Sequence, residues 1–141
     1  MFAVPENTIP VSAAPVAKHP LVIAAELARD ETRWRNRLRF DPVSRFVSLI
    51  DHTEEYEAWL LTWLPGQSTE LHTHGNTTGA FRVVSGVLTE EVMRTNETLA
   101  LESGQTRVFA PHYVHRVSNN GSEPAVSIHV YRPVREMRLY P

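Results

Sequence analysis

The chain has no cysteine among its 141 residues. Disulfides, thiolate metal ligands and a cysteine nucleophile are therefore excluded, and any transition metal must be held by imidazole or carboxylate groups. A long apolar run is also missing, because the stretch over residues 21–27 is interrupted by Glu26 and is too short to span a membrane. No basic start with an apolar segment precedes it. These absences predict a cytoplasmic protein without a membrane span.

The sequence shows no strong excess of charge of either sign. Its 14 basic and 16 acidic residues are mixed along the chain and leave a formal net charge of −2. Proteins that bind a phosphate backbone normally present a concentrated positive face, so nucleic acid is not expected as a partner. With 42% hydrophobic residues, a chain of this length is suited to one ordinary core. We expect a monomer or a small homo-oligomer that acts on a small molecule.

The composition and periodicity of the chain change twice. Residues 1–20 carry four prolines and no periodic pattern, which predicts an extended N-terminal arm in front of a single domain over residues 21–141. Apolar residues then recur at helical spacing up to residue 39, with Asp30 as a cap between two short helices. Beyond Pro42, short apolar or alternating runs separated by turn residues predict an all-β sandwich or barrel, with strands over 46–50, 56–64, 81–85, 87–94, 106–109, 114–118 and 125–131.

A pair of histidines is the first chemical signal. His72 and His74 are two residues apart, and side chains at that spacing on a strand point to the same side. They can offer two imidazoles to one metal ion if a third ligand comes from another strand. His112 falls in a turn, where exposure is expected, and His19 and His52 fall in loop-like contexts that suggest no role.

The residues around this pair form two longer patterns. The first is Gly66-x5-His72-x-His74-x4-Gly79-x6-Gly86, and the second consists of Gly104, Pro111, His115 and Asn119, with three residues between its histidine and its asparagine. Together they resemble the two motifs of the cupins. The resemblance implies a small double-stranded β-helix barrel, preceded here by short N-terminal helices, with His115 as the third metal ligand.

One ligand of most cupins is missing. A glutamate usually follows the histidine pair by four or five residues, where this chain has Thr78 and Gly79. A site of three histidines without the glutamate resembles that of the thiol dioxygenases, the family of cysteine dioxygenase and 3-mercaptopropionate dioxygenase. The resemblance implies that His72, His74 and His115 hold Fe(2+), and that the protein is a dioxygenase of sulfur metabolism. Such an enzyme converts a small thiol and O2 to the sulfinic acid.

A late segment extends the likeness. Ser127, His129 and Tyr131 share one face of a predicted strand, so the serine can fix the tautomer of the histidine, and the histidine can orient the tyrosine hydroxyl. The segment is similar to the family's hydrogen-bonded serine, histidine and tyrosine, which implies catalytic roles for all three residues. Animal cysteine dioxygenases carry a cysteine, crosslinked to the tyrosine, at the position of Gly79. That crosslink cannot form here.

The identity of the thiol depends on an arginine. The family's arginine for the substrate carboxylate aligns with Phe46 or Val47, and Arg45 stands one residue away, on the opposite face of a strand. We therefore expect a thiol other than cysteine, such as 3-mercaptopropionate or a heterocyclic thiol like ergothioneine. Arg45 or a late arginine (Arg132, Arg135 or Arg138) would meet any carboxylate, and three aromatic residues would contact the substrate: Trp59, Trp63 and Phe81.

Three alternatives remain open. In the first, Arg45 returns to register through a bulge, and the protein is a cysteine dioxygenase proper. In the second, the barrel binds a metal without catalysing a reaction, and the residues from Ser127 to Tyr131 need not form a hydrogen-bonded chain. In the third, the protein is a different metallocupin, an isomerase or a dioxygenase acting on carbon, that uses zinc, nickel or manganese.

Overall fold

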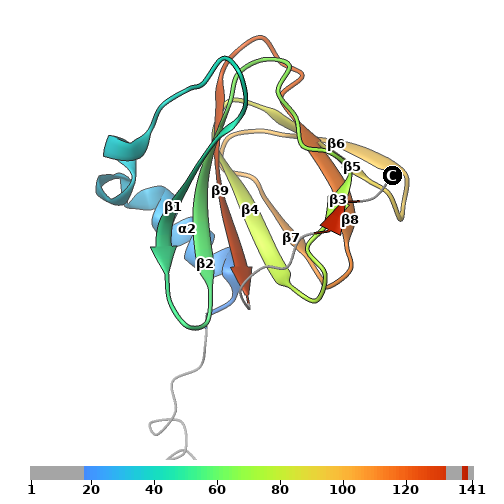
Figure 1. Ribbon diagram of the computed structural model, residues 1–141, viewed down its shortest axis with the longest axis horizontal. Helices are drawn as coiled ribbons and strands as arrows, with labels where there is room; N and C mark the ends of the chain where they lie inside the picture. The colour runs from blue at the N-terminus through green and yellow to red at the C-terminus, as the bar shows by residue number, and fades with distance from the viewer. Residues whose placement is uncertain (1–17, 133–137, 140–141) are drawn as a thin grey trace, which may run out of the picture.

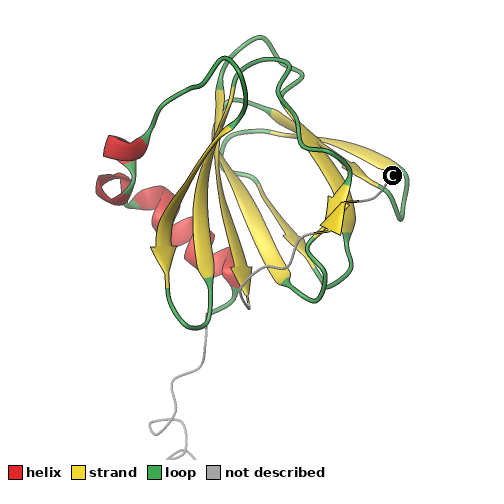
Figure 2. Ribbon diagram, viewed as in Figure 1, coloured by secondary structure: helices red, strands yellow, loops and turns green. Residues whose placement is uncertain are grey.

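The computed structural model describes residues 18–132 and the backbone of residues 138 and 139. Two five-stranded antiparallel sheets face each other and enclose the barrel interior, and the helical segments lie outside the first sheet (Figures 1 and 2). The all-β barrel with short N-terminal helices that the sequence predicts is confirmed. The arm predicted over residues 1–20 lies largely outside the described residues.

Each sheet combines strands that are distant in the chain. The first sheet has the order β1-β2-β9-β4-β7, with β1 (Phe46–His52), β2 (Glu57–Trp63), β9 (Ala125–Arg132), β4 (Thr78–Ser85) and β7 (Thr106–Phe109). The second has the order β10-β3-β8-β5-β6, with β10 (Arg138–Leu139), β3 (His72–Thr73), β8 (Val114–Ser118), β5 (Leu88–Val92) and β6 (Glu97–Leu101). His72 and His115 lie in the second sheet, and His74 directly follows β3. Ser127, His129 and Tyr131 lie in β9 of the first sheet.

The N-terminal helices cover the outer face of the first sheet. Helix α2 (Pro20–Arg29) begins inside the predicted arm, where His19 accepts a hydrogen bond from the Leu21 amide at 2.9 Å. Asp30 separates it from the 3-10 segments η2 (Glu31–Arg33) and η3 (Arg35–Arg37), as expected. The buried side of α2 packs on β9 and β4, and the resulting core layer includes Ile23, Leu27, Leu60, Ile128 and Val130.

Strand β9 is covered on both faces. Its even-numbered residues face the helix layer, and its odd-numbered residues face the barrel interior with Leu61, Phe81 and Val117. A strand covered on both sides needs apolar or satisfied polar side chains at every position. This requirement explains the nearly continuous burial of β9 and puts its polar residues, Ser127 and His129, in the interior.

Two motif residues have structural roles. Gly86 has φ +80°, and a Cβ at this position would lie 2.5 Å from the Pro124 carbonyl oxygen, so only glycine fits the turn. The buried Asn119 donates hydrogen bonds to the carbonyl oxygens of Trp63 and Glu123, at 3.0 and 2.9 Å. It therefore joins the end of β2 to the loop between β8 and β9.

Two differences from the predicted strands have simple causes. β6 was not predicted, because it is an edge strand in which Leu101 is the one buried residue, and its sequence lacks a clear apolar alternation. β5 ends at Val92, short of residue 94, because the chain turns through Asn96 at φ 58° into β6. Within the described part of the chain, no helix has the length and apolar character needed to cross a membrane.

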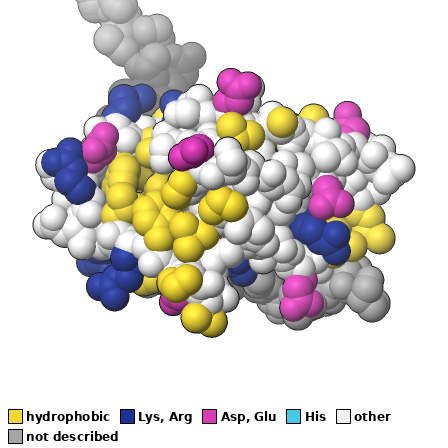
Figure 3. Space-filling model, turned by 90° about the horizontal axis from the view of Figure 1, so that it is seen from above, with side chains coloured by type: hydrophobic (Ala, Val, Ile, Leu, Met, Phe, Trp, Pro, Cys, Tyr) yellow, Lys and Arg dark blue, Asp and Glu magenta, His cyan; other side chains and the backbone are white. Residues whose placement is uncertain are grey.

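Partly exposed hydrophobic side chains occur on the surface. Figure 3 shows a group of them on the face seen from above, with basic side chains at its margin. Several exposed apolar residues belong to the edge strand β1 and the segment before it: Leu38, Phe40, Val43, Val47 and Leu49. Single exposed apolar residues are normal in monomers, so the expected oligomeric state stays a prediction.

Candidate metal centre

Sheet pairing brings three histidines together. His72 in β3 is the cross-strand neighbour of His115 in β8, and His74 follows two residues after His72. Their candidate ligand nitrogens all lie within 4.8 Å of one another, and all three side chains are buried. Cross-strand pairing supplies the third imidazole that the His72-x-His74 pair lacks.

Hydrogen bonds orient two of these rings. The Nδ1 of His72 lies 2.6 Å from the Glu70 carbonyl oxygen, and the Nδ1 of His115 lies 2.7 Å from the Glu90 carboxylate. Since both partners accept, each Nδ1 carries the hydrogen, and the Nε2 of the neutral ring keeps its lone pair. The buried Nε2 of His115 has no hydrogen-bond partner within residues 18–132. Nitrogen donors prepared in this way fit a transition-metal ion.

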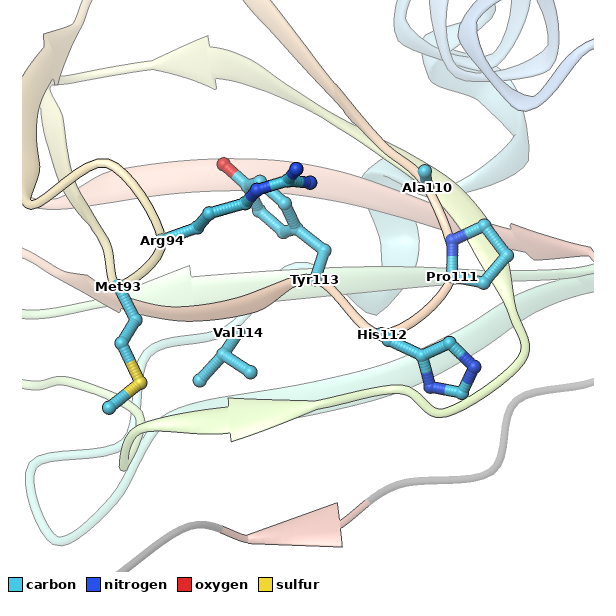
Figure 4. Close-up of a pocket in the computed structure, with 7 residues that line it drawn as sticks. All are labelled: Met93, Arg94, Ala110, Pro111, His112, Tyr113 and Val114. Atoms are coloured by element: carbon cyan, nitrogen blue, oxygen red, sulfur yellow. The ribbon is translucent and has the colours of Figure 1, made fainter.

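His112 lies apart from the cluster. Its side chain is exposed, as predicted, and its backbone adopts φ 65° in the turn before β8. It lines an outer pocket of about 330 Å³ (Figure 4), whose other lining residues are Met93, Arg94, Ala110, Pro111, Tyr113 and Val114. His115, three residues on, is buried and lines a separate, inner cavity.

Glu90 is a site residue that the sequence analysis missed. It is fully buried in β5 on the same face as Leu88 and Val92, and it accepts hydrogen bonds from Arg107 Nε at 2.6 Å and Tyr113 at 3.1 Å. Burial opposes ionisation of Glu90, but hydrogen bonds from His115 and Arg107 outweigh it and lower the pKa of this carboxyl group. A sequence signal existed, since Glu90 lies in phase with two apolar strand residues.

Ser127, His129 and Tyr131 form a continuous row on the inner face of β9. The Ser127 hydroxyl lies 2.8 Å from His129 Nε2, and the Tyr131 hydroxyl lies 3.4 Å from His129 Nδ1. Trp63 Nε1 donates to Ser127 Oγ at 2.9 Å, and an indole nitrogen can only donate. The indole occupies one lone pair of the serine oxygen, and the hydroxyl hydrogen of this fully buried serine can be donated to His129 Nε2. In that tautomer the imidazole hydrogen is on Nδ1, facing the Tyr131 oxygen.

A small cavity of about 40 Å³ joins the histidine cluster to this row. Its walls also include an arginine and neutral side chains, and the lining residues are Arg45, Leu61, Thr69, His72, His74, His115, Val117, His129 and Tyr131. The volume is close to that of one or two water molecules. A ligand beside a bound metal would therefore have to be small.

Arg45, one of the residues expected to contact the substrate, lines the cavity. Strand alternation alone would have turned its side chain away from the site. Strand β1 begins at Phe46, so the alternation rule does not apply to Arg45. Its guanidinium lies 5.3 Å from the centre of the Trp63 ring, a favourable cation–π distance. Of the late arginines, Arg132 donates to the Lys18 carbonyl oxygen at 2.6 Å, away from the cavity. Arg135 and the Arg138 side chain lie outside the described residues.

The three aromatic residues expected around the substrate do not line the cavity. Trp63 and Phe81 are completely buried beneath the row, where Phe81 stacks on His129 with ring centres 5.0 Å apart. Trp59 donates to the Glu57 carboxylate at 2.5 Å. Strand alternation correctly put them on the inner face, but it does not tell how far along the barrel interior a side chain lies from the cavity. In β2, Leu61 is the residue that lines the cavity.

Gly79 is closely covered by an aromatic ring. A Cβ at this position would overlap the end of the Phe109 ring. The same ring lies 5.4 Å from the rings of His74 and His115 and 6.0 Å from that of Tyr131. Phe109 thus fills the space beside Gly79 and packs against both the histidine cluster and the tyrosine.

Solved structures share this fold at low sequence identity. A protein with a double-stranded β-helix domain from Klebsiella pneumoniae is 21% identical, with a TM-score of 0.69 over 76% of this chain and 93% of that one. TT1209 from Thermus thermophilus is 22% identical, with a TM-score of 0.65 over 71% and 93%. An RmlC-like cupin from Desulfovibrio desulfuricans is 18% identical, with a TM-score of 0.61 over 69% and 90%. These likenesses establish the cupin fold.

A family model provides the functional class. The model for cysteine dioxygenase type I matches residues 13–140. With the cluster of His72, His74 and His115, this match indicates a metal-dependent cupin and an oxidoreductase of the cysteine dioxygenase kind. Since the match spans nearly the whole sequence, the chain belongs to the cysteine dioxygenase type I family.

Proposed function

We propose that this protein is an iron(II)-dependent thiol dioxygenase that converts a small, carboxylate-bearing thiol and O2 to the sulfinic acid. The observation that carries the proposal is that the three histidines, Tyr131 and Arg45 line one small cavity. The reaction adds both atoms of O2 to the sulfur and needs no further reductant. A non-catalytic metal-binding cupin would not require an arginine and an oriented tyrosine beside the metal ligands.

His72, His74 and His115 hold the iron in this proposal. Iron(II), when bound, supplies the redox chemistry that activates dioxygen toward a thiolate. Three neutral imidazoles leave the positive charge of the ion uncompensated, which favours the anionic form of the thiol. Glu90 does not offset that charge, because its carboxylate is already paired with Arg107.

Tyr131 acts as a hydrogen-bond donor toward the substrate. Its oxygen accepts the Nδ1 hydrogen of His129, so its own hydroxyl hydrogen can be directed to the cavity. A donor fixed before the reaction stabilises developing negative charge without having to reorganise. Leu61 and Val117 add apolar walls that limit water around the reacting groups.

Arg45 selects the substrate by its carboxylate. A guanidinium can bind a carboxylate through two parallel hydrogen bonds, and Trp63 supports the side chain from behind. The cavity is small and is lined by none of Trp59, Trp63 and Phe81, so aliphatic thiols such as cysteine and 3-mercaptopropionate fit better than a bulky heterocycle like ergothioneine. The structure thereby gives less support to the heterocyclic substrate expected from the sequence.

Oxygen uptake on a thiol panel tests the proposal. Iron(II)-loaded protein is assayed with cysteine, 3-mercaptopropionate, cysteamine and ergothioneine, and ¹⁸O2 traces both oxygen atoms into the sulfinate. We expect a carboxylate-bearing thiol to exceed cysteamine in kcat/KM by about tenfold or more, about 1.4 kcal/mol of transition-state preference. No sulfinate from any thiol would favour the non-catalytic alternative or another metallocupin chemistry.

A matched pair of arginine variants tests the role of Arg45. Arg45→Gln should lower kcat/KM for carboxylate-bearing thiols by about 10- to 100-fold, since a charged hydrogen bond contributes about 1.5–3 kcal/mol. Cysteamine turnover should hardly change. The control is Arg39→Gln, because Arg39 also lies 5.3 Å from an aromatic ring, that of Phe46, but does not line the cavity. Equal losses in both variants would contradict a carboxylate contact.

A further inference from the structure

Glu90 is a buried charge whose position calls for an explanation beyond folding. Its exposure is 0%, and it lies in the middle of β5, next to the β8 strand that carries His115. Removing a carboxylate from water costs several kcal/mol, and replacement of a buried ion pair by apolar residues is often neutral or stabilising. Stability alone therefore gives no reason for a glutamate here.

The partners of Glu90 hold its carboxylate in one orientation. Oε1 accepts from Arg107 Nε at 2.6 Å, and Oε2 accepts from Tyr113 at 3.1 Å. Tyr113 in turn accepts a hydrogen bond from Arg107 Nη2 at 3.2 Å, so the tyrosine hydrogen is directed to the glutamate. The three side chains thus form a closed ring of hydrogen bonds.

His115 is the fourth member of this network and is the one that reaches the cavity. Its Nδ1 lies 2.7 Å from Glu90 Oε2, and an ionised carboxylate can only accept, so the hydrogen must be on Nδ1. The ring cannot rotate without breaking this charged hydrogen bond. Nε2 is consequently held without a hydrogen on the side of His72 and His74.

We propose that Glu90 is a positioning residue that fixes the tautomer and ring orientation of His115 and so strengthens metal binding, with Arg107 and Tyr113 holding the glutamate in place. The proposal rests on the metal site described under the proposed function. Partners of this kind behind a metal-bound histidine typically change metal affinity about 10- to 100-fold. Glu90 does not touch the substrate cavity.

Titration of the metal-free protein with Co(II) tests the effect on affinity. Glu90→Gln keeps the size of the side chain and removes its charge, and we expect the Kd for Co(II) to rise about 10- to 100-fold. The control is Glu91→Gln, because Glu91 lies on the outer face of the same strand, in an exposed ion pair with Arg116 at 3.8 Å. Its Kd should match the wild-type value.

Nitrogen NMR of histidine-labelled, metal-free protein tests the tautomer directly. His115 in the wild type should carry its hydrogen on Nδ1, and Glu90→Gln should give a mixture of tautomers, because an amide can either donate or accept. A general loss of packing would not select one tautomer at one histidine. A folded Glu90→Gln variant with wild-type Kd and wild-type His115 signals would overturn the proposal.

A milder variant decides the matter if Glu90→Gln does not fold. Tyr113→Phe removes one hydrogen bond to the carboxylate and leaves the Glu90–Arg107 pair intact, so the Kd should rise about two- to fivefold. No change in Kd or in the His115 tautomer in that variant would overturn the proposal. Failure of the metal site itself looks different: wild-type protein would not bind Co(II), while the His115 tautomer would still respond to Glu90→Gln.

Discussion

His115 and His129 are both buried histidines on the inner faces of opposing sheets, but their ring nitrogens have different partners. His115 has a carboxylate on Nδ1, and its Nε2 points to two other imidazoles. His129 has a hydroxyl near each nitrogen, from Ser127 and Tyr131. An imidazole with both nitrogens in hydrogen bonds is unsuited to bind a metal, whereas a carboxylate on one side prepares the other nitrogen to do so.

The comparison shows that the partner, more than the burial, sets the role of a buried histidine. Both side chains are at most 5% exposed, so burial does not distinguish them. The charged network of Glu90 lies behind the first histidine, and the neutral chain from Trp63 lies behind the second. In the proposed function, metal binding and proton orientation therefore belong to opposite sides of one cavity.

Substitution of each histidine should give the largest difference between the two, measured as the Kd for Co(II). His115→Ala should raise the Kd for Co(II) by about 100-fold or more, because a ligand to a metal contributes several kcal/mol. His129→Gln should leave the Kd within about twofold, since its nitrogens contact hydroxyl groups. Titration of both metal-free variants measures the difference, with the exposed His112→Ala as a control. Similar losses in all three would mean that the ligand set is wrong.

Tyr131→Phe should separate the two sheets by function. The variant keeps the ring against His74 and removes the hydroxyl beside His129. If the hydroxyl stabilises the transition state, turnover of the preferred thiol should fall about 10- to 1000-fold, or roughly 1.4–4 kcal/mol, with iron content unchanged. Oxygen uptake and metal analysis of the same sample test this. Loss of iron together with activity would show that Tyr131 supports the metal site instead.

A substitution at Gly79 should disturb both the histidine cluster and Tyr131, because the Phe109 ring contacts His115 and Tyr131. Gly79→Ala introduces a Cβ into the Phe109 ring, and the variant should lose about 1–3 kcal/mol of unfolding free energy. Gly121→Ala is the control, since its Cβ would meet Asn119 Oδ1 at an ordinary 3.5 Å. Urea unfolding compares the two, and a double variant with Phe109→Leu should recover part of the loss. Equal stability of both single variants would refute the steric account.

Sequence patterns predicted the alignment of Ser127, His129 and Tyr131 on β9 and the meeting of the three histidines. They did not predict the residues that contact these two groups. The strand alternation of residues 127 to 131 and the two cupin-like motifs are local features, so they can be recognised without knowledge of the fold. Glu90 was missed because a glutamate in an alternating strand is usually exposed, and its reason for burial, His115, is 25 residues away.

At two points the structure of the cavity differs from what strand alternation indicates, and both have geometric causes. Arg45 was assigned by strand alternation, although the strand starts one residue later. Trp63 and Phe81 were assigned to the correct face, but alternation carries no information about depth within a barrel. Sheet pairing and the length of each strand decide both points, and neither can be read from a single segment.

Tyr56 tests whether changes outside the cavity alter metal affinity or turnover, because it lies away from His115 and His129. Its hydroxyl donates to Asp51 at 2.5 Å, and Asp51 also pairs with Arg33 at 3.2 Å. Burial, together with the hydrogen bond to Asp51, raises the pKa of Tyr56 to about 12. A tyrosine whose pKa is higher in the folded than in the unfolded chain, where it is about 10, stabilises the fold below pH 10. That contribution is lost as the pH rises through 12.

Tyr56→Phe should therefore change the pH dependence of stability and little else. At pH 8 the variant should be less stable by about 1 kcal/mol, because the hydrogen bond to Asp51 is lost. Between pH 10 and pH 12 the gap to the wild type should narrow, since only the wild type loses the contribution of Tyr56. Urea unfolding at several pH values measures this, while Co(II) affinity and thiol turnover at neutral pH should stay within about twofold. A gap that stays constant up to pH 12 would rule out the raised pKa, and a change in metal affinity would show that the outer face of the first sheet is coupled to the metal centre.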